Sequence, residues 1–87
     1  MHVIFSKTFS KSYKKLDSKI QHAFEKRLRI FVTNEFDPIL RNHTLKGKNK
    51  TIRSITITGD FRAHYTIHES DVRYFVTIGS HSELYEK

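Results

Sequence analysis

Side chains suited to phosphodiester chemistry gather in the second half of the chain. His43 lies in a lysine-rich segment, and residues 59–65, Gly-Asp-Phe-Arg-Ala-His-Tyr, place Arg62 beside an aromatic residue. Residues 79–85 then read Gly-Ser-His-Ser-Glu-Leu-Tyr. Histidine can transfer a proton near neutral pH, arginine can neutralise a charged phosphate, and tyrosine can stack on a base. The combination predicts a site that binds or cleaves a phosphodiester backbone without a metal ion.

The bulk composition limits the fold and indicates a polyanionic partner. The 87 residues make a single domain, residues 1–87, whose core must be compact because the chain is short. Sixteen lysines and arginines against nine aspartates and glutamates give a net charge of +7, which favours binding to nucleic acid, the ribosome or an acidic protein. Cysteine is absent, which excludes disulfides and thiolate zinc sites, so apolar packing must stabilise the domain.

The sequence predicts neither a membrane segment nor a metal or cofactor site. Only three consecutive apolar residues, 3–5, occur near the start, too few for a signal-peptide core or a membrane span, so we expect a cytoplasmic protein. His64 and His68 lie four residues apart on an expected strand, roughly 13 Å at about 3.3 Å per residue, which is too far to ligate one metal ion together.

Apolar periodicity predicts a strand followed by two helices. Residues 3–5 form a short strand, and Ser6 can cap a helix that begins near Lys7. A second apolar stripe at helical spacing begins after Asp17 and continues to about Asn34. Turn-forming residues without apolar periodicity follow, so we expect a loop from Asp37 to Asn49.

From Thr51 onward the apolar period changes to two, which predicts three strands. The residues expected on the buried face are Ile55 and Ile57, then Phe61, Ala63, Tyr65 and Ile67, then Val72, Tyr74, Val76 and Ile78. Short turn sequences join the strands, so they should form an antiparallel meander. The order β-α-α-β-β-β predicts a small α+β fold in which the two helices cover the apolar sheet face.

The opposite strand positions should form a polar, cationic face that contacts RNA. An aromatic residue among them, Phe75, is better explained by base stacking than by folding. The loop before the meander adds positive charges and contains no carboxylate, which favours binding to phosphates. The candidate RNA-binding residues are Arg41, Lys46, Lys48, Lys50, Arg53, His64, Arg73 and Phe75. A solvated sheet face and a solubilising loop are the alternatives.

The ordered motifs resemble the RelE/ParE toxin superfamily, closest to its YafQ-like branch. They are His43-x-Leu45-x-Gly47, Arg53, Gly59-Asp60-Phe61-Arg62-x-x-Tyr65 and Ile78-Gly79-Ser80-His81-Ser82-Glu83-Leu84-Tyr85, and the likeness covers nearly the whole chain. The resemblance implies a RelE-like fold and the toxin of a type II toxin–antitoxin pair. It also implies a ribosome-dependent messenger RNase that a cognate antitoxin neutralises, with operator DNA bound only through the antitoxin complex.

The resemblance also assigns the candidate catalytic residues. Matching positions are His43, Asp60, His81 and Tyr85, while Arg62 matches the arginine of the RelE-type branch. A strand histidine of the YafQ-like branch is replaced by Thr56.

We hypothesise that the ribose 2′-hydroxyl attacks the adjacent phosphate. In this hypothesis His43 is the base, His81 the acid, Arg62 neutralises the phosphorane, Asp60 orders the loop or a histidine, and Tyr85 positions a nucleotide. The alternatives are a non-catalytic toxin of the ParE type that acts on DNA gyrase, and a degenerate toxin that only binds its antitoxin.

Overall fold

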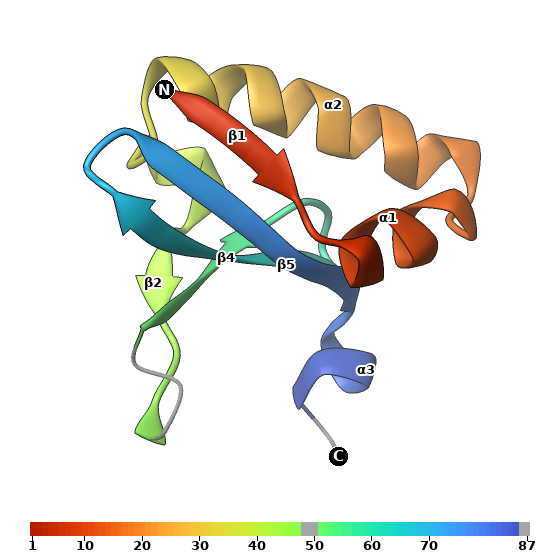
Figure 1. Cartoon of the computed structure of the whole chain (residues 1–87). Coiled ribbons are helices and arrows are strands. Elements are labelled where there is room, and N and C mark those ends of the chain that lie inside the picture. Colours follow the sequence, from red (N-terminus) through yellow and green to blue (C-terminus); the bar gives the residue numbers. More distant parts are fainter. Residues whose placement is uncertain (48–50, 86–87) are drawn as a thin grey trace.

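The structure, a computed structural model, describes residues 1–47 and 51–85 and confirms the predicted α+β fold. Its helices are α1 (Lys7–Lys14), α2 (Ser18–Thr33), the 3₁₀ helix η1 (Pro38–Leu40) and α3 (His81–Tyr85). Its strands are β1 (His2–Phe5), β2 (His43–Thr44), β3 (Ile52–Thr56), β4 (Phe61–Glu69) and β5 (Val72–Ser80). The helices α1 and α2 lie on one side of the sheet, whereas α3 lies apart from them, below the sheet in this view (Figure 1).

The five strands form one mixed sheet in the order β1-β5-β4-β3-β2. β1 runs parallel to β5, and the other pairings are antiparallel, so the predicted meander of β3, β4 and β5 is confirmed. The sequence predicts a loop over residues 37–49, yet η1 and β2 form there. Asp37 Oδ1 accepts the Ile39 N–H at 3.0 Å and caps η1, while the two residues of β2 pair with β3.

Both predicted helix starts are confirmed by side-chain caps. Ser6 Oγ accepts the Phe9 N–H at 2.9 Å, and Asp17 Oδ1 accepts the Lys19 N–H at 3.0 Å. The second helix ends at Thr33, close to its expected end. No helix within the described ranges is long and apolar enough to cross a membrane.

Aromatic rings fill much of the core between the sheet and the two long helices. The buried apolar residues are Phe9, Phe24, Phe31, Leu40, Ile55, Ile57, Ala63, Tyr65, Phe75 and Ile78. The Phe75 ring lies 5.8 Å from Phe24 and 5.3 Å from Phe31, measured between centroids and edge to face in both pairs. Such pairs add to the stabilisation that area burial alone supplies. The predicted burial of β3 and of the centre of β4 is therefore confirmed.

A bulge in β5 reverses the predicted facing of its first half. The pairing with β4 passes from His64–Thr77 directly to Tyr65–Phe75, so Val76 is an extra residue in β5. Because one extra residue exchanges the two faces of a strand, Phe75 and Ile78 both face the helices. The prediction that Phe75 is exposed for base stacking is wrong, since its side chain is fully buried.

The bulge also directs Arg73 into a polar network around the buried carboxylate of Glu35. Arg73 donates from Nε and Nη2 to this carboxylate, both at 3.0 Å, and Tyr65 Oη donates to it at 2.5 Å. Burial opposes ionisation of Glu35, but the hydrogen bonds from Arg73 and Tyr65 outweigh it and lower the pKa of the carboxyl group. The prediction that Arg73 faces solvent is wrong, because its side chain is 12% exposed and held in this network, while its predicted contact with RNA stays a prediction.

Arg53 takes part in the same network. Its Nε donates to Asn42 Oδ1 at 2.7 Å, and its guanidinium carbon lies 5.2 Å from the centre of the Phe36 ring. These contacts hold the segment that leads into β2. The predicted contact of Arg53 with RNA stays a prediction, and its observed partners are within the protein.

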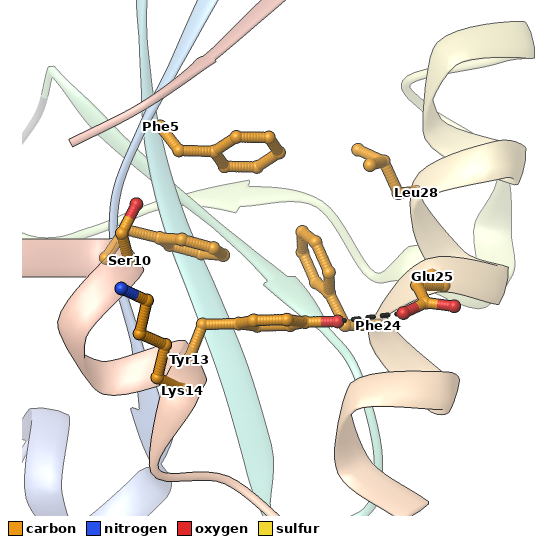
Figure 2. A pocket seen from close by; sticks show the side chains of 8 residues that line it. Phe5, Ser10, Tyr13, Lys14, Phe24, Glu25 and Leu28 are labelled. Carbon is orange, nitrogen blue, oxygen red and sulfur yellow. Dashed lines mark hydrogen bonds between the residues drawn. The ribbon is translucent and has the colours of Figure 1, made fainter. Parts of the chain in front are cut away.

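An apolar hollow of about 380 Å³ lies between α1 and α2. Figure 2 shows Phe5, Tyr13, Phe24 and Leu28 around it, with Tyr13 Oη donating to Glu25 Oε2 at 3.1 Å. No histidine or arginine lines this hollow. The side chains suited to acid-base chemistry on a phosphate lie elsewhere, around the outer strands and α3.

Candidate active site

His43 is held at the start of β2 by the residues before it. Asn42 Nδ2 donates to Tyr65 Oη at 2.7 Å and to the Glu35 carbonyl at 3.1 Å, which ties the segment to the core. His43 Nδ1 lies 2.9 Å from the Arg41 carbonyl. Since a carbonyl can only accept, Nδ1 carries the proton and Nε2 keeps a lone pair in the neutral ring. The exposed imidazole of His43 therefore presents a proton acceptor to solvent.

Tyr85 joins α3 to β3 and β4, two strands of the meander. Its hydroxyl donates to Ser54 Oγ on β3 at 2.8 Å and lies 2.9 Å from His64 Nε2 on β4. A tyrosine hydroxyl has one proton, so His64 Nε2–H is the donor to Tyr85. Ser54 also pairs with His43 across β2 and β3. The phenol is therefore fixed close to the strand that carries His43.

His64 is neutral at physiological pH. Burial, followed by the nearby charge of His43, lowers the pKa of His64 to about 4. The prediction placed His64 on a solvent-facing surface that contacts RNA. It does share a sheet face with Ser54, but its side chain is buried and bonded to Tyr85, so the predicted exposure is wrong.

His81 begins α3 and lies against Tyr85. The two ring centroids are 4.5 Å apart, and the His81 imidazole is exposed. The His81 N–H donates to the Asp60 carbonyl at 2.7 Å, so Asp60 positions the histidine through its main chain. A Cβ atom on Gly79 would lie 3.3 Å from Leu84 Cδ2, so glycine allows α3 to pack closely on the end of β5.

Ser80 and Glu83 form a reciprocal cap at the start of α3. The Ser80 N–H donates to Glu83 Oε1 at 2.8 Å, and the Glu83 N–H donates to Ser80 Oγ at 3.2 Å. The sequence analysis missed this helix. The signal that could have found it is the Ser-x-x-Glu spacing itself.

His43 and Tyr85 line one hollow of about 420 Å³. The other side chains around it are Thr44, Leu45, Lys46 and Leu84. Lys46 adds a positive charge at the rim, whereas the predicted contacts of Lys48 and Lys50 lie outside the described residues. The hollow offers a proton acceptor, a cation and an aromatic ring. Within the described ranges, no three histidine or acidic side chains gather closely enough to hold a metal ion.

Arg62 lines a second hollow, of about 480 Å³, and does not line the one that contains His43. The remaining residues of this second hollow are Arg27, Pro38, Ile39, Arg41, Thr56, Thr58 and Gly59. Arg62 Nη1 donates to the carbonyls of Thr58 and Phe61 at 2.9 and 3.0 Å. The sequence analysis missed Arg27, because a single arginine on a helix looks like an ordinary solvated residue.

Comparison with known proteins links this geometry to bacterial toxins. Residues 1–86 match the family described as bacterial toxin of type II toxin-antitoxin system, YafQ. The chain is similar in fold to YafQ from E. coli strain BL21(DE3), at 17% identity with a TM-score of 0.79 over 95% of this chain and 96% of that chain. It is also similar to a YoeB/ParE toxin from Agrobacterium tumefaciens, at 18% identity and a TM-score of 0.78 over 93% and 99% of the two chains.

A third similar structure is a copper-bound mutant toxin from Helicobacter pylori, at 28% identity with a TM-score of 0.73 over 98% of this chain and 99% of that chain. YafQ has also been solved in the E. coli DinJ–YafQ toxin–antitoxin complex, which matches at 21% identity and a TM-score of 0.70 over 95% and 94% of the two chains. Among curated protein sequences, none matches this chain significantly.

Proposed function

Because this chain belongs to the YafQ family of bacterial type II toxin–antitoxin toxins, we propose that it is an endoribonuclease that cleaves messenger RNA at the ribosome and thereby stops translation. The observation that carries the proposal is that two histidines contact Tyr85 and a third lines the same hollow as this tyrosine. His43 and Tyr85 line the same hollow, while His64 and His81 both contact the Tyr85 ring. Imidazoles next to a basic rim provide what acid-base cleavage of RNA requires.

The proposed reaction is a transesterification within the RNA, in which the phosphorus exchanges its bond to the 5′-oxygen for a bond to the 2′-oxygen. The neutral His43 accepts the proton of a ribose 2′-hydroxyl at Nε2, and the 2′-oxygen forms a bond to the adjacent phosphorus. The bond from phosphorus to the 5′-oxygen breaks, and protonated His81 donates its proton to that oxygen. The products are a 2′,3′-cyclic phosphate and a 5′-hydroxyl. Exchange of the two protons with water restores both histidines, so the cycle needs no metal ion.

Tyr85 has a positioning role in this proposal. Its hydroxyl is held by Ser54 and His64, so the ring is fixed between His81 and the hollow and can orient a nucleotide. A neutral His64 supports this arrangement, because a charged imidazole there would oppose protonation of His43. Lys46 lies where it can bind the phosphate that reacts.

We propose that a cognate antitoxin holds the toxin inactive. YafQ in the similar E. coli structure is bound to DinJ, and the net charge of +7 on this chain suits an acidic partner. Binding to operator DNA would then occur only through the antitoxin complex. The protein is proposed to act in the cytoplasm, where messenger RNA and the ribosome are.

The test is mapping of new messenger 5′ ends by primer extension after induction of the toxin. His43→Ala and His81→Ala should each reduce cleavage by roughly 100-fold to 10,000-fold, as is usual when an acid or base is removed. His22→Ala is the matched control, because His22 is an exposed histidine on α2. It should cleave like the wild type.

Undiminished cleavage by both His43→Ala and His81→Ala would refute the assigned site. A wild-type toxin that induces the SOS response and produces no new messenger ends would instead indicate action on DNA gyrase. Induction that causes no growth arrest, no new messenger ends and no SOS response would instead indicate a degenerate toxin that only binds its antitoxin. Circular dichroism of each variant separates lost chemistry from lost folding.

A further inference from the structure

Three arginines that have no carboxylate partner among the described residues line the second hollow. Arg27 comes from α2, Arg41 from the residue after η1, and Arg62 from β4, yet all three border the same cavity. Among the described residues, none of the three forms an ion pair, and no carboxylate lines the hollow. Like charges that converge without a counter-ion repel one another, so an anion that binds there is stabilised.

Two of these guanidinium groups are already oriented. Arg27 Nη1 donates to the Ile39 carbonyl at 2.7 Å, and Arg62 Nη1 donates to the Thr58 carbonyl at 2.9 Å. Each is anchored through one nitrogen, and their remaining N–H groups have no partner among the described residues. A guanidinium fixed in this way loses little conformational freedom when it binds a phosphate with two parallel hydrogen bonds.

The hollow adjoins the candidate active site through Arg41. The Arg41 carbonyl accepts the hydrogen bond from His43 Nδ1, and the two residues are two positions apart, at most roughly 6.6 Å along an extended chain. The two hollows are therefore bordered by residues that are neighbours along the chain. A strand of RNA whose reacting phosphate lies beside His43 can therefore place a neighbouring phosphate in the second hollow.

We infer that Arg27, Arg41 and Arg62 form a subsite for a backbone phosphate of single-stranded RNA, next to the phosphate that reacts. The inference rests on the proposed ribonuclease function, whose substrate it describes. Arg62 then binds the strand beside the cleaved bond and does not neutralise the phosphorane itself. Arg27 becomes part of the RNA contact surface although it lies on a helix that mainly covers the core.

The experiment measures binding of the purified toxin to a 2′-O-methyl RNA hexamer, which cannot be cleaved, across a range of salt concentrations. Arg41→Gln should weaken binding about tenfold and reduce the slope of log Kobs against log salt by about 0.7, the value for one phosphate of a single strand. Arg27→Gln should behave alike. Arg29→Gln is the matched control, since Arg29 is exposed on the same helix and lies outside the hollow.

A series of hexamers with one neutral methylphosphonate each locates the phosphate. At one linkage, the neutral RNA and Arg41→Gln should not have additive effects, because both remove the same contact. Additive effects at every linkage, together with an unchanged salt slope, would overturn the subsite. The ribonuclease proposal would still stand if the wild type cleaves messenger RNA.

Two other outcomes also count against the subsite. Arg41→Gln could keep full affinity for the hexamer and lose affinity for the antitoxin, which would assign the hollow to an acidic protein segment. Failure of the wild type both to bind and to cleave RNA would refute the proposed function, and the subsite with it. Because the Arg41 side chain is exposed and makes no hydrogen bond among the described residues, its variant tests binding without disturbing the fold.

Discussion

The arginines of this domain form two groups, one that lies near the Glu35 carboxylate and one that lines the second hollow. Arg73 donates twice to Glu35, and Arg53 lies close enough to help lower the pKa of the same group. Arg27, Arg41 and Arg62 border a hollow that no carboxylate lines within the described ranges. In the first group Arg73 is paired with Glu35 and Arg53 contacts Asn42 and Phe36, whereas none of the second group forms an ion pair among the described residues.

The contrast shows that the number of cations says little about where an anion binds. The sequence analysis gave Arg41, Arg53 and Arg73 the same role in RNA binding, and it gave Arg62 a catalytic role. What separates them is the position of Glu35, which the turn after α2 places beside the core. An arginine that is bound to a buried carboxylate has a structural role. Arginines that lie away from the carboxylate can bind an anionic ligand.

The largest expected effect comes from removing the first group's main ion pair. Arg73→Ala leaves the Glu35 carboxylate buried without its strongest partner, which should lower the free energy of unfolding by about 3 to 5 kcal/mol. Urea unfolding followed by circular dichroism measures this loss. At low temperature, where the variant is still folded, its affinity for RNA should equal that of the wild type.

Replacing both partners tests the reason for that loss. Arg73→Met together with Glu35→Leu should recover part of the stability, because no charge is then left buried. If Arg73→Ala costs less than about 1 kcal/mol, or if it weakens RNA binding as strongly as Arg41→Gln, the division into two groups is wrong.

The fold could be predicted from the sequence wherever side chains set local structure. Ser6 and Asp17 cap the helices at the expected places, and alternation in β3 and β4 identified the buried face. The β5 bulge could not be predicted, because its cause is the tertiary fit of Phe75 among the rings of the core. Val72, Tyr74, Val76 and Ile78 alternate regularly along β5, so periodicity alone selected a single face for the whole strand.

The candidate site was predictable in its residue types and less so in its geometry. Tyr85 lines one hollow with His43 and contacts His81, and the catalytic roles that the sequence analysis gave these residues stay predictions. The hydrogen bond from His64 to Tyr85 depends on the angle of a short helix, which no spacing encodes. The role of Arg27 depends on contacts between segments far apart in the chain.

An intermediate effect should appear as a loss of stability in acid, through His64 at the candidate site and Glu35 beside the first group of arginines. Burial lowers the pKa of His64 to about 4, so the unfolded chain binds a proton near pH 6.5 that the folded chain does not bind until about pH 4. Stability from this group is therefore present above pH 6.5 and is lost as pH falls, by about 3 kcal/mol between pH 7 and pH 4. Glu35, whose pKa is also lowered, adds a loss of the same sign as pH falls further.

Thermal unfolding at several pH values measures this dependence. His64→Gln should have a lower stability at pH 7 and a flatter dependence between pH 7 and pH 4, because the titrating group is gone. His22→Gln, at an exposed position, should keep the wild-type dependence. An unchanged slope in His64→Gln would show that this histidine is not the group that titrates.

The smallest expected effect on stability belongs to the second group. Arg41→Gln removes one of three converging charges and no hydrogen bond among the described residues, so the free energy of unfolding should stay within about 0.5 kcal/mol of the wild type or rise slightly as repulsion falls. The measurement is urea unfolding at low and high salt. A rise that disappears at high salt would identify the relieved repulsion, because salt screens exposed charges. A loss of unfolding free energy comparable to that of Arg73→Ala would mean that Arg41 is a structural residue. Its charge would then not be available to bind RNA in the hollow.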